Sequence, residues 1–419
     1  MTANARPGSA PAAAPTLPPP KRWTAALAFA ALAVNVGFFG PIQILLARQA
    51  ELVSAESKAS VLALVAGVGA LCSMVANPLW GALSDRTTGR WGRRLPWVLG
   101  GAVGGAGGLV LLATAESVGG MILGWSVVQV ALNAEFAALA AAIPDQVPVD
   151  RRGAAGGWFG LAQTVGVLIG TGLAVSGGAA TGGVLGGYLA CAVFVVLATV
   201  PFVLLRRDVR LTRAERPPWD AAAFARGFWP RGFGADFGWA WLTRFLMNLG
   251  NALALLYLLY YLKDEVGLVD AESGVLVLTS VYAVALLSTV VVGGVWSDRT
   301  GRRRIFVMGS GVIMAVASAM MVAWPTWPGA VLAAGVLGIG FGTYTSVDFA
   351  LVTQVLPAAA DRGKDLGVIN IANTLPQVLS PVVAAPIVAH LGGYPTLYLV
   401  AAAVGLLGAT LVYRIRGVR

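Results

Sequence analysis

Residues 81–87 read Gly81-Ala-Leu-Ser84-Asp85-Arg86-Thr87, and residues 294–300 repeat the pattern as Gly294-Val-Trp-Ser297-Asp298-Arg299-Thr300. The two stretches lie 213 residues apart, and each one leads into a cluster of arginines. The same offset places Asn35 on Asn248 and Glu135 on Asp348. We therefore predict that the chain consists of two copies of one structural unit, and that the paired acids mark equivalent positions in the two copies.

The composition is that of an integral membrane protein. Of the 419 residues, 57% are hydrophobic and only 11% are charged, whereas a soluble domain carries roughly 25% charged residues. The net charge of +10 does not indicate a nucleic-acid partner, because the basic residues lie in loops between apolar runs. Cys72 and Cys191 fall within apolar runs and His390 is the single histidine, so neither a disulfide framework nor a metal site or other cofactor is expected.

Twelve apolar runs are long enough to cross a bilayer, which takes about 20 residues. The fold class is therefore an all-α membrane protein, with twelve transmembrane helices in two pseudo-symmetric bundles of six. Residues 1–20, rich in Ala and Pro, are predicted to form a disordered tail. The N-terminal bundle covers residues 21–205, a cytoplasmic linker covers 206–236, and the C-terminal bundle covers 237–419. The predicted spans are 23–47, 59–83, 96–114, 119–144, 154–177, 183–205, 237–262, 273–296, 305–324, 328–356, 366–390 and 394–413.

The basic residues predict the orientation of these spans. With both termini in the cytoplasm, all but four of the 29 lysines and arginines lie on the inner side, as the positive-inside rule requires. The exceptions are Arg48, Lys58 and Lys263 in outer loops and Arg244 within a span. We expect a multi-pass protein of the cell membrane. No loop holds a phosphate-binding, metal or nucleophile motif, so the chain is not expected to be an enzyme.

The pattern Gly-x-x-x-Asp-Arg-x-x-Gly-Arg-Arg after the second and eighth spans resembles the signature loop of the major facilitator superfamily. This resemblance covers the whole chain. It implies a secondary transporter that works by alternating access, and usually a functional monomer acting on a small-molecule substrate. Paired halves that flank a midplane site are typical of such carriers.

A narrower resemblance involves the longer stretch from Ser84 to Trp97, which is similar to the loop of glycoside–cation and proton–sucrose symporters. The segment from Asn133 to Asp145 is similar to the fourth-helix region of the same families. The second helix has no acidic pair of the kind that sodium-coupled melibiose-type carriers use there, which favours protons over sodium. The resemblance therefore implies proton-coupled symport of a sugar or glycoside.

Two alternatives remain open. One is a proton-driven exporter of a small organic compound or drug, although the fifth span lacks the Gly-Pro pair typical of such exporters. The other is a non-transporting sensor or assembly factor, which the intact loops and paired acids disfavour.

Three ionisable residues, Glu135, Arg244 and Asp348, lie well inside spans. A charge at mid-bilayer costs at least about 2.5–3.5 kcal/mol, so such groups face a cavity, pair with each other or take up a proton. Glu135 precedes Pro144 by nine residues, which places it about 13 Å from the inner edge and near the midplane. Asp348 lies at the same depth, and the family fold implies that both acids face a central cavity. We predict that one of them carries the coupled proton; the alternative is that each only anchors a neighbouring helix through a buried salt bridge.

Polar side chains at helical spacing predict the substrate contacts. Arg244, Asn248 and Asn251 share one helix face, and Asp236, Asp298 and Asp348 are candidate acid partners of Arg244. In the fourth span, Gln129 and Asn133 share a face, but Asn133 lies about 200° from Glu135, so at least one of these polar groups packs against another helix. The substrate-binding candidates are Asn35, Gln43, Arg244, Asn248, Asn251, Asn370, Asn373 and Gln377.

The twin loops are predicted to form a cytoplasmic gate, since the family resemblance places their aspartates near helix N-termini and arginines across the interface of the two halves. A second repeat, Arg-Gly-x-x-x-Gly, begins at Arg152 and Arg362 on the same side. Positive-inside charges needed for insertion are the alternative explanation of the arginines. The gate candidates are Gly81, Asp85, Arg86, Gly92, Arg93, Arg94, Arg152, Asp298, Arg299, Arg302 and Arg362.

Overall fold

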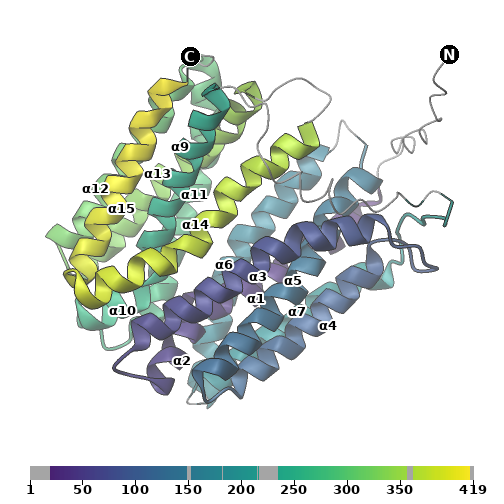
Figure 1. Ribbon diagram of the computed structural model, residues 1–419, viewed down its shortest axis with the longest axis horizontal. Helices are drawn as coiled ribbons and strands as arrows, with labels where there is room; N and C mark the ends of the chain where they lie inside the picture. The colour runs from purple at the N-terminus through teal and green to yellow at the C-terminus, as the bar shows by residue number, and fades with distance from the viewer. Residues whose placement is uncertain are drawn as a thin grey trace, which may run out of the picture.

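The computed structural model describes residues 19–148, 152–181, 183–214, 216, 235–355 and 362–415. Within its helices, the side chains of residues 152–154, 157, 291, 294, 295, 298, 349–355 and 362–370 lie outside the described set. The described residues form helices and connecting turns without a strand. Figure 1 shows them as two groups of long helices that run side by side.

The helices of the first half are α1 (Lys21–Gly40), the π-helical turn η1 (Pro41–Leu45), α2 (Leu46–Val53), α3 (Lys58–Asp85), α4 (Leu95–Ala113), α5 (Val118–Gln146), α6 (Arg152–Thr181) and α7 (Val184–Leu204). Those of the second half are α9 (Ala235–Leu256), α10 (Leu258–Asp264), α11 (Ala271–Thr300), α12 (Arg303–Ala323), α13 (Trp327–Val355), α14 (Arg362–His390) and α15 (Gly393–Leu411), followed by the short 3-10 turn η3 (Val412–Arg414).

Eleven of the described helical segments are long and apolar enough to cross a membrane, and there are twelve if α9 and α10, which meet at 43°, form one bent span. The segment from α1 through η1 to α2 counts as one span of 33 residues. The prediction of an all-helical protein with twelve spans is confirmed.

The two halves repeat one packing scheme. In the first half, α5 packs on α3 and α4, and α7 packs on α1 and α4. In the second half, α13 packs on α11 and α12, and α15 packs on α9 and α12. The pair α1–α6 likewise corresponds to α9–α14. Helices therefore occupy equivalent places in the two halves, as the sequence repeat predicts.

The halves meet along two long seams. Helix α3 packs against α14, and α6 packs against α11. Because α3 corresponds to α11 and α6 to α14, the two seams are equivalent to each other in the repeat. Figure 1 shows α14 lying beside α3, with α2 and α10 near each other at one end of the molecule.

A break interrupts the first span of each half at an equivalent position. In the first half the helix widens into the π turn at Pro41–Leu45, where proline lacks the N–H needed for a regular helical bond. In the second half the helix bends at Tyr257, which lies 213 residues after Ile44. The segments beyond these breaks, α2 and α10, are short helices that lie at the same end of the molecule.

Candidate functional site

A charged pair lies inside the second half. Arg244 on α9 places its Nη1 3.0 Å from Oδ2 of Asp348 on α13. The two side chains are only 14% and 8% exposed. Tyr344, one turn earlier on α13, donates its hydroxyl to the other aspartate oxygen at 2.9 Å. Of the three acids considered as partners of Arg244, the structure places Asp348 in contact with it.

Two asparagines extend this pair toward α14. The Arg244 Nε donates to Oδ1 of Asn373 at 2.7 Å, and Asn248 Nδ2 donates to the same oxygen at 3.3 Å. The Asn248 amide also donates to the backbone carbonyl of Arg244. Three helices, α9, α13 and α14, therefore meet at one polar cluster, which we call the Arg244 cluster: Arg244, Asn248, Tyr344, Asp348 and Asn373.

Glu135 occupies the equivalent position in the first half but has a different environment. Its side chain is fully buried, and Oε1 accepts a 2.7 Å hydrogen bond from Thr199 on α7. Oε2 has no hydrogen-bond partner. A methyl group at Gly101 of α4 would stand 2.6 Å from the Glu135 backbone nitrogen, so α4 and α5 are in direct backbone contact here.

The expectation that both acids face one cavity is therefore wrong for Glu135 in this conformation, because its carboxyl is enclosed by α4, α5 and α7. Asn133, two residues earlier, bonds to Ser73 and Asn77 on α3. The prediction that at least one of these α5 polar groups packs against another helix is confirmed.

The other substrate-binding candidates are dispersed. The Asn35 amide donates to Ala31 O of its own helix at 2.7 Å and is buried. Asn251 is buried and accepts from the hydroxyl of Tyr282 on α11 at 3.3 Å. Gln43 is half-buried in the π turn, and Gln377 is exposed on α14. The side chain of Asn370 lies outside the described residues. Only Arg244, Asn248 and Asn373 of the candidates are in mutual contact within the described part of the chain.

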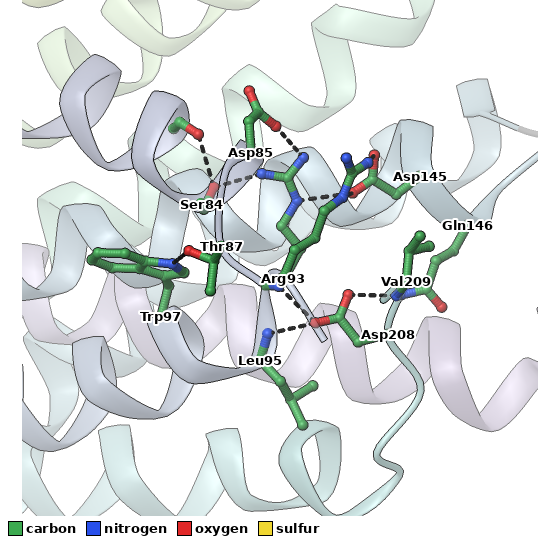
Figure 2. A network of polar contacts seen from close by, with 12 residues as sticks. Ser84, Asp85, Thr87, Arg93, Leu95, Trp97, Asp145, Gln146, Asp208 and Val209 are labelled. Atoms are coloured by element: carbon green, nitrogen blue, oxygen red, sulfur yellow. Dashed lines mark hydrogen bonds and ion pairs between the residues drawn. The ribbon is translucent and has the colours of Figure 1, made fainter. Parts of the chain in front are cut away.

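The turn between α3 and α4 is held by a network of ionic bonds (Figure 2). Arg94, whose side chain is 3% exposed, donates to Asp145 at the end of α5 (2.8 Å), to Asp85 and to Ser84. Arg93 forms a second, bidentate pair with Asp145. These bonds join the ends of α3, α4 and α5 within the first half.

The segment after α7 completes this network. The Asp208 carboxylate accepts the backbone N–H groups of Arg94 and Leu95 at 2.6 and 2.8 Å, and that of Val209 at 2.7 Å. It thereby caps the first turn of α4, although it is remote in sequence. Burial raises the pKa of the Asp208 carboxyl above its ordinary value, while the backbone N–H bonds and Arg94 act in the opposite direction. Gly92, with φ of +94°, lies against this carboxylate.

Of the two loops predicted to form a cytoplasmic gate, the structure describes mainly the first. In the described part of the chain, the bonds of Asp85 and Arg94 connect residues of the first half, whereas the family resemblance implies bonds across the interface of the halves. Gly81 and Arg86 are half-buried, whereas Arg299 and Arg302 are exposed. The side chains of Arg152, Asp298 and Arg362 lie outside the described residues.

Contacts between the halves are well described at the opposite end, where α2 and α10 lie. Lys58 Nζ lies 2.9 Å from Asp264 of the second half and 3.5 Å from Glu51 of the first. Lys263 Nζ in turn binds Glu51 at 2.7 Å. Glu51 and Asp264 occupy equivalent positions in the two halves, 213 residues apart, and both lie beside Lys58. Arg48 pairs with Glu272 beside them.

Two tyrosines of the second half reinforce this seam. Tyr260 donates its hydroxyl to Ala47 O at 2.7 Å, and Tyr257 donates to Ala59 O at 2.9 Å. We call the four charged residues Glu51, Lys58, Lys263 and Asp264 and the two tyrosines the α2–α10 seam. Sequence reasoning placed Lys58 and Lys263 in outer loops but missed that they join the halves. The repeat relates Glu51 to Asp264, but it gives no indication that these two residues meet.

Comparison with known proteins fits this architecture. The family model for the Major Facilitator Superfamily matches residues 25–264 and 240–419. A stretch of 36 residues is 53% identical to an uncharacterized symporter of Synechocystis sp., covering 9% of this chain and 7% of that protein.

Solved transporters share the fold. A POT family transporter in complex with 5-aminolevulinic acid superposes with a TM-score of 0.71 at 12% identity, over 94% of this chain and 96% of that one. A peptide transporter POT in complex with sulfate gives 0.71 at 13% identity, over 94% of each chain.

The family match covers nearly all of the described helices, and the superfamily consists of transporters rather than enzymes. The chain is therefore a multi-pass membrane transporter that belongs to the Major Facilitator Superfamily.

Proposed function

We propose that this chain is a secondary transporter that moves a sugar or glycoside together with protons by alternating access. The observation that carries the proposal is the Arg244–Asp348 pair, at 3.0 Å inside the second half. A buried carboxylate held by one arginine can exist in two states, paired or protonated, and a change between them alters the charge of the site.

The polar groups around the pair suit a hydroxylated solute. Asn248 and Asn373 offer amide groups on two neighbouring helices, and Arg244 adds N–H donors beyond the two in its described bonds. Two solved transporters of the same fold, a POT family transporter and a peptide transporter, are in complex with 5-aminolevulinic acid and with sulfate, so the fold can hold small polar molecules.

Alternating access requires one end of the molecule to be closed while the other opens. The α2–α10 seam supplies bonds for the closed position at one end. If both termini are cytoplasmic, as we propose, this end faces the outside of the cell membrane. In this arrangement the substrate would enter and leave on the cytoplasmic side, with the monomer as the working unit.

Glu135 is the second acid available for protons. Its Oε2 is buried without a partner, which favours a neutral carboxyl in the membrane interior. We propose that it helps to couple proton movement to helix rearrangement in the first half, while Asp348 acts at the substrate.

The test is proton flux into proteoliposomes on addition of sugars and glycosides, with Asp348→Asn and Glu135→Gln beside wild type. A solute-driven pH change that Asp348→Asn abolishes supports the proposal. Full gradient-driven uptake by Asp348→Asn would refute its coupling role. Proton movement opposite to that of the solute would favour the exporter.

A further inference from the structure

The charge balance of the Arg244 cluster depends on a single carboxylate. Among the described side chains, Asp348 is the one acid bonded to Arg244. An arginine keeps its proton at any pH a protein meets, whereas an aspartate can take one up. Protonation of Asp348 therefore leaves a guanidinium that is 14% exposed without its counter-charge, and an unpaired buried charge is strongly unfavourable.

The guanidinium has room for another acceptor. Its Nε binds Asn373 and its Nη1 binds Asp348, so two of five N–H donors are used in these bonds. The planar edge of a guanidinium is well suited to a carboxylate, which it binds with two parallel hydrogen bonds.

We propose that Arg244 binds a carboxylate of the transported solute, which replaces Asp348 when that aspartate is protonated. This inference rests on the proposed function and names the substrate class more narrowly: a hydroxylated carboxylic acid such as a sugar acid, in place of a neutral sugar. One guanidinium balances one negative charge, so the solute is a monoanion.

The exchange conserves charge and protons. A proton from the solution adds to a carboxylate oxygen of Asp348, its ion pair with Arg244 breaks, and the solute carboxylate forms a new ion pair with Arg244. On release, Asp348 gives the proton to the other side and binds Arg244 again as the solute leaves. One anion and one proton cross together, so transport is electroneutral.

The surroundings of Asp348 fit this exchange. Tyr344 holds the aspartate through Oδ1 at 2.9 Å, which leaves Oδ2 as the oxygen that faces Arg244. The titratable groups in described contact with Asp348 are Arg244 from α9 and Tyr344 from α13 itself. Beyond these, the described charged residues on the helices packed against α13 are Asp236 on α9, Glu272 and Arg299 on α11, and Arg303 and Arg304 on α12, all within the first or last turns.

The first arm of the experiment tests the anion site without transport. In purified Asp348→Asn, Arg244 lacks its carboxylate, so formate should raise the melting temperature of this variant while formamide, its uncharged analogue, should not. The double variant Arg244→Gln/Asp348→Asn should lose the response to formate. An equal response to formate and formamide, or an unchanged response in the double variant, would overturn the inference.

The second arm uses wild-type protein, in case Asp348→Asn does not fold. In proteoliposomes, D-glucuronate should drive proton uptake without creating a membrane potential, and D-glucose should not. If D-glucose drives proton uptake and D-glucuronate does not, the proposed function stands and the carboxylate inference fails. If neither solute drives proton uptake but formate stabilises Asp348→Asn, the anion site stands and the proposed function fails.

Discussion

The stability of the Arg244–Asp348 pair gives a sharp test of the cluster. At 3.0 Å and an effective dielectric constant of ~20, the Coulomb attraction between the two charges is about 5.5 kcal/mol. Desolvation of the two groups offsets much of this attraction. We therefore expect the pair as a whole to add little net stability, and the loss of one partner alone to be costly.

The two single variants should differ. Asp348→Asn leaves a guanidinium that cannot lose its charge, so it should destabilise by about 3–5 kcal/mol, the range for breaking a buried pair. Arg244→Gln leaves an aspartate that can become neutral by taking up a proton, so its cost should be smaller. The double variant should lie close to wild type, so the coupling energy should approach the sum of the two single costs.

The chain carries its own reporter for this measurement. Cys191 is fully buried, and the one other cysteine is Cys72. In a Cys72→Ser background, reaction of Cys191 with a thiol-specific dye during heating would follow unfolding. If the two single substitutions change the free energy of unfolding additively, Arg244 and Asp348 do not interact directly. If both substitutions cost the same, Asp348 does not relieve the loss of Arg244 by taking up a proton.

Three further predictions concern other parts of the molecule. Lys58→Met removes partly exposed ion pairs worth about 0.5–1 kcal/mol. Maleimide labelling of an Ala47→Cys reporter at the α2–α10 seam should therefore quicken roughly two- to fivefold. An unchanged labelling rate would count against a role of these ion pairs in closing this end. Thr199→Val leaves the buried Glu135 carboxyl without its 2.7 Å bond at a cost of about 1–3 kcal/mol, which melting curves should show, whereas Thr199→Ser should stay near wild type. Because the pKa of Asp208 is raised in the folded protein, its contribution to stability is present below the unfolded pKa and is lost as pH rises through the folded pKa. The difference in melting temperature between wild type and Asp208→Asn should accordingly be largest in acid and shrink as pH rises, and a difference that grows would contradict this.

The sequence predicts the elements of this fold well because each span carries its own signal. A span is a run of apolar residues whose length the bilayer sets, and the observed helices follow those runs closely. The polar stripe that links Arg244 to Asn248 could also be predicted, because residues four apart share a helix face. In the structure both side chains donate to the same oxygen, Oδ1 of Asn373.

Contacts between distant helices could not be predicted in the same way. Asp208 caps the first turn of α4 from beyond α7, and nothing in the spacing of either segment indicates that they meet. Lys58 joins the halves because α10 brings Asp264 to it, which depends on how the two bundles are placed against each other. The sequence shows only that such charges lie in outer loops.

The two repeat-equivalent acids show how one position can serve two purposes. The offset that relates Glu135 to Asp348 also relates Arg244 to Ala31, so the first half has no arginine where the second half has one. Glu135 therefore has no cation at that place and is bonded instead to Thr199.

This difference in partners separates the roles of the halves. A carboxyl with a hydroxyl donor and an unpartnered oxygen can change its proton without leaving a charge behind on a neighbour. A carboxyl paired with arginine cannot change its proton in this way, because its protonation leaves the guanidinium without a counter-charge. On the carboxylate proposal, the second half alone among the described residues links a proton to an external anion, and the substitution Ala31→Arg tests this. The test uses the Asp348→Asn/Arg244→Gln background, in which the second half has lost its own site. If an arginine at position 31 can pair with Glu135, then Ala31→Arg together with Glu135→Gln leaves that arginine without its acid. Formate should then raise the melting temperature of this variant. Absence of that response would show that the anion site needs more than a charged pair, namely the amides of Asn248 and Asn373.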